Sequence, residues 1–136
     1  MQGAIKRFWP AVAWAILILI LTGVPGTYFP EVETFWEWLT PDKIVHMGIF
    51  GVQVFLILLG FDPQYLAGKN RYVVVIGAAI VTILYGLITE LLQHFVFIGR
   101  DGNMFDFLAD AAGALLGLLA YYLLKIRNTV AKMNIE

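Results

Sequence analysis

Apolar residues form four long runs along this chain, and short polar stretches separate them. The runs cover about residues 8–24, 43–61, 72–97 and 105–124. Each approaches the roughly 20 residues that a helix needs to cross the hydrocarbon core of a bilayer. A soluble bundle would carry a polar stripe at helical spacing, and stretches such as AWAILILILTG carry none. The pattern predicts an all-α, polytopic membrane protein, a four-transmembrane-helix bundle in a single domain, residues 1–136.

A shorter amphipathic stretch, PGTYFPEVETFWEWLTP, follows the first run. Its apolar residues recur at helical spacing, at Val32, Phe35, Trp36 and Leu39. The glutamates lie largely off that face, so we expect a short helix at about residues 31–39 on the outer membrane surface. An interfacial spacer is the simpler interpretation of this helix, and a lid over a ligand is the alternative.

Positive charges predict the orientation, because cytoplasmic segments are enriched in Lys and Arg. With the N-terminus inside, the inner segments hold Lys6, Arg7, Lys69, Arg71, Lys125, Arg127 and Lys132. The outer segments then hold only Lys43 and Arg100. We therefore expect a multi-pass protein of the bacterial inner membrane with both termini in the cytoplasm.

The amino-acid composition argues against several classes of protein, partner and site. Hydrophobic residues make up 60% of the chain and charged residues 14%, which is far from the balance of a soluble domain. The net charge of -1 argues against a nucleic-acid partner, which would favour a basic surface. The chain contains neither cysteine nor serine, so a thiolate metal site and a Ser or Cys nucleophile are excluded.

Glycines in two of the runs indicate close helix packing. Gly48 and Gly51 follow the start of the second run, which the Thr40-Pro41-Asp42 sequence marks as a helix N-terminus. Gly113 and Gly117 form GALLG in the fourth run, a small-xxx-small pattern that allows helix backbones to approach in lipid. We assign these glycines to structure.

Polar residues gather at the predicted outer ends of three helices. They are Asp42, Lys43 and His46 in the second helix, Glu90, Gln93 and His94 in the third, and Asp106 and Asp110 in the fourth, with Arg100 in the loop between the last two. The up-and-down order of the helices places these groups at one depth, and the inner halves of the helices have nothing comparable. The arrangement predicts one polar pocket, with a purely structural ion-pair network as the alternative.

The same residues resemble a known family. They are Asp42, Lys43 and His46 in DKIVH, Glu90 and Gln93 in ELLQ, Arg100, and Asp106 with the following Gly113 and Gly117. In this order and spacing they resemble the VanZ-like family of small bacterial membrane proteins, over helices two to four. The family pattern commonly has Asn where this chain has Asp110, which adds a potential negative charge. The resemblance implies a link to low-level resistance against teicoplanin.

We expect a cell-envelope protein whose outer pocket binds or modifies an anionic or lipid-linked ligand among the membrane lipids. The predicted ligand-binding residues are Lys43, Gln93, Arg100 and Asp110, with the two cations suited to phosphate or carboxylate. The predicted catalytic residues are His46 and Glu90 as general acid and base, with Asp42 or Asp106 orienting the imidazole. A variant has a divalent metal held by His46, Glu90, Asp106 and Asp110.

Two other functions are compatible with this pattern. A small transporter or proton-coupled channel would need ionisable groups along its whole path, which the inner halves of the helices lack. A structural or assembly protein would use the polar cluster only to set helix register. The sequence leaves open whether a reaction is catalysed and how many chains associate.

Overall fold

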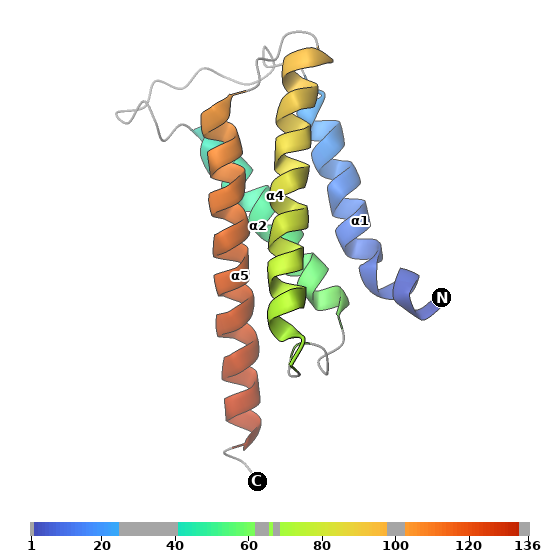
Figure 1. Ribbon diagram of the computed structural model, residues 1–136, viewed down its shortest axis with the longest axis vertical. Coiled ribbons are helices and arrows are strands. Elements are labelled where there is room, and N and C mark those ends of the chain that lie inside the picture. Colours follow the sequence, from blue (N-terminus) through green and yellow to red (C-terminus); the bar gives the residue numbers. More distant parts are fainter. Residues whose placement is uncertain (1, 25–40, 62–65, 67–68, 98–102, 134–136) are drawn as a thin grey trace.

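The computed structural model describes residues 2–24, 41–61, 66, 69–97 and 103–133. Its long helices are α1 (Gln2–Thr22), α2 (Pro41–Gly60), α4 (Arg71–Phe95) and α5 (Met104–Met133), which lie side by side as a bundle (Figure 1). The described ranges contain no β-strand. The predicted all-α class is confirmed.

Within the described residues, three helices are long and apolar enough to cross a membrane. They are α2, α4 and the part of α5 from Met104 to Lys125. Three of the predicted spans are therefore supported by the structure, and the use of α1 as a fourth span stays a prediction. The amphipathic helix predicted at residues 31–39 lies outside the described residues.

The helices begin and end at different residues from the apolar runs. Helix α1 already begins at Gln2, and α5 continues to Met133. Apolar side chains mark the part of a helix that lies in lipid, whereas backbone hydrogen bonds continue the helix beyond that boundary. Helix α2 begins at Pro41, where proline at the first helical position was predicted.

The distribution of side chains is the reverse of that in a soluble protein. Large apolar residues cover the outside, and Ile80, Leu84 and Leu119 are each about half exposed. Polar side chains are buried instead, at Thr22, His46, Gln53, Thr82, Thr89, Glu90, Gln93, Asp106 and Asp110. An apolar exterior suits lipid contact, and a buried polar group in lipid needs a partner inside the protein.

Glycines bring α2 and α5 into the most extensive contact of the bundle. A Cβ atom added at Gly113 would lie 2.7 Å from Met47 Cα, and one added at Gly117 would lie 2.9 Å from the carbonyl carbon of Gly51. The packing role predicted for GALLG and Gly51 is confirmed. The same expectation for Gly48 is wrong, because open space surrounds it.

Hydrogen bonds between side chains and backbone carbonyl groups also connect α1 to the other helices. Trp14 of α1 donates its indole N–H to the carbonyl oxygen of Ile49 on α2, at 2.8 Å. Gln53 donates to Ala11 O at 3.3 Å, and the hydroxyl of Tyr85 donates to Ala15 O. Such bonds between helices contribute on the order of 0.6 kcal/mol each in a membrane. The N-terminal ends of α2 and α5 lie at the same end of the bundle as the C-terminal ends of α1 and α4 (Figure 1).

Candidate polar site at one end of the bundle

His46 is the centre of the polar cluster. It lies in the second turn of α2, is buried, and has Phe50 stacked beside it, with ring centroids 6.5 Å apart. Its Nδ1 atom is 2.8 Å from Oδ1 of Asp110, a residue of α5 that is fully buried. An ionised carboxylate only accepts hydrogen bonds, so Nδ1 donates to it, and in the neutral imidazole Nε2 then carries the lone pair. This contact joins residues that are 64 positions apart in the chain.

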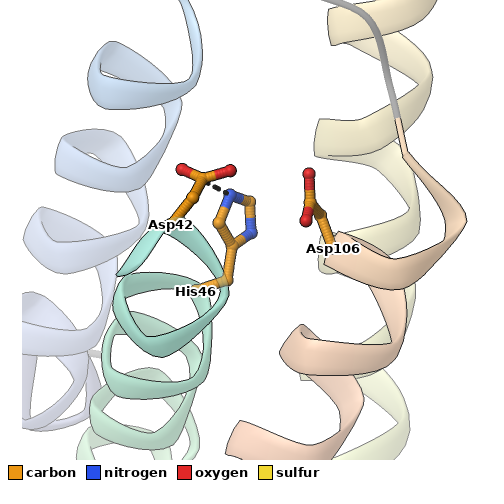
Figure 2. A group of neighbouring side chains, drawn as sticks. All are labelled: Asp42, His46 and Asp106. Carbon is orange, nitrogen blue, oxygen red and sulfur yellow. Dashed lines mark ion pairs between the residues drawn. The ribbon is translucent and has the colours of Figure 1, made fainter. Parts of the chain in front are cut away.

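Two further aspartates flank the imidazole. Asp42, one helical turn before His46, has its Oδ1 atom 4.0 Å from Nε2. Figure 2 shows the carboxylate of Asp106 facing the ring from α5, so that His46 lies between the two aspartates. Lys43 pairs with Asp106 across 3.6 Å, between Nζ and Oδ1. The side chain of Asp42 is 48% exposed, and this part of the cluster is therefore open to the surroundings.

Glu90 joins the cluster from α4. Its Oε1 atom lies 3.9 Å from His46 Nδ1, and its Oε2 atom accepts a 2.8 Å hydrogen bond from the backbone N–H of Asn103. Asn103 in turn accepts a bond from the N–H of Phe105 with its side-chain oxygen, at 3.0 Å, as an N-cap of α5 does. The end of α4 is thus tied to the start of α5.

Two residues that support this geometry had no predicted role. Gly86 of α4 lies against Asp110, and a Cβ added there would be 2.9 Å from Asp110 Oδ2. Asn103 is the other, through its bonds to Glu90 and Phe105. The sequence contains a feature that indicates each of these roles. An isolated glycine in an apolar helix indicates close packing, and an asparagine directly before a helix indicates an N-cap.

The cluster is rich in carboxylate. Its described members are four carboxyl groups, one imidazole and one lysine: Asp42, Glu90, Asp106, Asp110, His46 and Lys43. Two of the carboxylate oxygens, Asp106 Oδ1 and Asp110 Oδ2, are buried and have no hydrogen-bond partner within the described structure. Buried carboxylates are stabilised by cations, by hydrogen bonds or by protons, so the arrangement suits proton exchange or the binding of a cation.

Potential metal ligands fall into two groups that share His46. One group is Asp42, His46 and Asp106, and the other is His46, Glu90 and Asp110. Within each group, one ligand atom per residue lies within 4.8 Å of the others. The four-residue metal set considered from the sequence is thereby divided between two groups, and Asp42 joins one of them.

The predicted site residues thus meet in part. Asp42, Lys43 and His46 of α2 lie together with Glu90 of α4 and both aspartates of α5. Gln93, one turn after Glu90, is buried, and its side-chain amide donates to the carbonyl oxygen of Thr22 on α1, at 3.5 Å. Arg100 lies outside the described residues. The catalytic and ligand-binding roles of all these residues stay predictions.

Comparison with known proteins gives one match. The family model described as VanZ/LLP1 matches residues 6–125, which include all of α2 and α4, most of α1 and α5, and every residue of the cluster. No curated protein and no solved structure matches the chain.

Proposed function

The chain belongs to the VanZ/LLP1 family of membrane proteins, and from that premise we propose that it acts in the bacterial cell envelope by binding an anionic or lipid-linked ligand. The ligand would occupy the cluster around His46, at the outer face of the inner membrane. The name of the family is linked to teicoplanin resistance, so reduced susceptibility to this lipoglycopeptide is the expected phenotype.

The buried contact between His46 and Asp110 is the observation that carries this proposal. Helix packing alone would be served by apolar residues, and ionisable groups inside a membrane protein are costly unless they are paired or used. Here three further carboxyl groups gather around the one pair, from three different helices. Asp110 holds the imidazole in one orientation, which is how a ligand-binding or acid–base histidine is positioned.

Lys43 supports an anionic ligand. Its ammonium group pairs with Asp106, and the residue before it in the chain is the half-exposed Asp42. A lysine there attracts phosphate or carboxylate as a point charge. Arg100 would add a second cation in this proposal, from the loop between α4 and α5. Modification of the ligand would use His46 or Glu90 as the group that carries a proton.

A transport function is less well supported. Among the described residues, the buried Asp, Glu and His side chains all belong to the cluster, and the hydrophobic core cluster consists of Val54, Leu58 and Ala78. A proton or ion path through the protein would need ionisable groups beyond the cluster. The site is therefore better suited to a ligand that enters and leaves on the same side.

The proposal is tested by susceptibility to teicoplanin in a sensitive host. We expect the wild-type protein to raise the minimum inhibitory concentration, and His46→Ala and Glu90→Gln to abolish the increase at equal protein abundance. His94→Ala is the matched control, because His94 is exposed on α4. If the His46→Ala and Glu90→Gln proteins protect as well as the wild type, the proposed site is wrong.

A further inference from the structure

We propose that His46, Asp42 and Asp106 form a binding site for a divalent metal ion, and that this ion holds the anionic group of the ligand. Only the identity of the ligand rests on the proposed function. The metal site is inferred from its geometry alone. The ligand set is one imidazole nitrogen and two carboxylate oxygens, which suits a borderline ion such as Zn²⁺ or Mn²⁺.

The orientation of His46 selects this group of ligands over the other. When Nδ1 donates a hydrogen bond to Asp110, the other nitrogen of the neutral ring, Nε2, has its lone pair on the side of Asp42. Histidines that bind metal usually donate their second ring N–H to a carboxylate or carbonyl group, which fixes the ring and raises its basicity. Asp110 is the carboxylate that accepts this hydrogen bond from His46. Glu90, on the Nδ1 side, already accepts a hydrogen bond from Asn103.

One buried carboxylate oxygen of the group has room for a closer cation. Asp106 is 8% exposed, and within the described residues its Oδ1 atom has an ion pair with Lys43 at 3.6 Å but no hydrogen bond. Figure 2 shows this carboxylate directed at the imidazole from the side opposite Asp42. A buried carboxylate oxygen without a hydrogen bond is costly, and a metal ion would complete its coordination.

The dimensions of the group fit an ion after a small adjustment. One ligand atom from each residue lies within 4.8 Å of the others. Ligand atoms that are each about 2.0–2.2 Å from one ion are roughly 3–4 Å apart. Asp42 is the residue that can close this difference, because its side chain is 48% exposed and therefore free to rotate. Its exposure also leaves a coordination position open toward the surroundings.

Charge gives the ion its function. The described cluster has four carboxyl groups and only Lys43 and His46 as possible cations, so by itself it repels an anion. A divalent ion on Asp42 and Asp106 would offset their charge and offer its open position to a phosphate or carboxylate oxygen. His46 then acts as a ligand, and any transfer of protons is left to Glu90.

Metal binding to the purified, full-length protein in detergent tests the inference. After treatment with EDTA, the protein is dialysed against Zn²⁺, Mn²⁺, Mg²⁺ or Ca²⁺, and bound metal is measured by mass spectrometry and titration calorimetry. We expect about one Zn²⁺ or Mn²⁺ per chain. His46→Ala, Asp106→Asn and Asp42→Asn should each weaken binding at least ~10-fold. Asp42→Asn is the variant least prone to misfold, because Asp42 is half-exposed.

Two control variants separate the possible sites. His94→Ala should bind the ion with unchanged affinity, because His94 is exposed on α4. Glu90→Gln removes a charge near His46 but no proposed ligand, so it should weaken binding less than His46→Ala does. Circular dichroism checks that all variants keep their helices. Absence of bound metal in the wild type, or equal binding by the His46→Ala and Asp42→Asn proteins, overturns the inference. Loss of binding in Glu90→Gln overturns the choice of ligands. Metal bound as expected without any effect on teicoplanin susceptibility contradicts the proposed function alone.

Discussion

At the scale of single residues, Asp110 is the group on which the arrangement of the cluster depends most. It is fully buried, it accepts the hydrogen bond of His46, and its carboxylate lies against Gly86, where a side chain would collide with it. The resemblance of the sequence to the VanZ-like family implied Asn at this position. The side-chain oxygen of Asn also accepts a hydrogen bond, so the contact with His46 does not itself require the charge.

Replacement of Asp110 separates the hydrogen bond from the charge. Asp110→Ala leaves the Nδ1–H of His46 buried without a partner, and we expect it to lower the free energy of unfolding by about 1–3 kcal/mol. Asp110→Asn keeps an acceptor of the same shape and should cost clearly less. Unfolding measured in mixed micelles checks both values. Equal losses in the two variants would show that the contact with His46 does not stabilise the fold.

At the scale of helices, the contact between α2 and α5 decides whether the site can form. His46 lies on one helix and Asp110 on the other, and their backbones approach at Gly51, Gly113 and Gly117. A larger residue at these positions would separate the helices and with them the two halves of the cluster. The small residues and the polar site therefore lie on the same interface between α2 and α5, about one turn apart.

A pair of glycine substitutions tests this interface. Gly117→Ala places a methyl group 2.9 Å from the carbonyl carbon of Gly51, and we expect a loss of about 1–3 kcal/mol in the free energy of unfolding. Gly48→Ala on α2 is the matched control. Nothing lies within 4 Å of that position, so the change should be neutral or slightly stabilising, because alanine favours a helix. Similar effects of the two substitutions would contradict the packing role.

At the scale of the whole molecule, the site lies at one end of an apolar bundle. The polar ends of α2, α4 and α5 meet there, and the outer surface of these helices is apolar. A membrane would therefore hold the cluster near one of its two faces. Which face this is follows from the distribution of Lys and Arg, which predicts the outer one.

Labelling of single cysteines tests the orientation, because the chain has no cysteine of its own. Cysteines introduced at Gly26 and Gly102 should react with a membrane-impermeant reagent added to intact cells. One introduced at Gly68 should react only after the cells are opened. The reverse pattern would place the cluster on the cytoplasmic side and exclude an extracellular ligand.

The sequence by itself determined the membrane class, the helical content and the end of each helix at which the polar residues lie. These properties depend on composition and on distance along the chain, since each helical residue adds 1.5 Å of rise. Asp42, His46, Glu90 and Asp106 could be assigned to one level of the bundle for that reason. The start of α2 at Pro41 and the packing of GALLG followed from local signals of the same kind.

Only the tertiary structure decided which of these residues touch. The rotation of each helix about its axis and the choice of its neighbours depend on packing between helices, which no local spacing specifies. The pairing of His46 with Asp110, the support from Gly86 and Asn103, and the direction of Gln93 toward α1 therefore appear only in the folded chain. As a result, Asp110 and Glu90 lie near one nitrogen of the imidazole and Asp42 lies near the other.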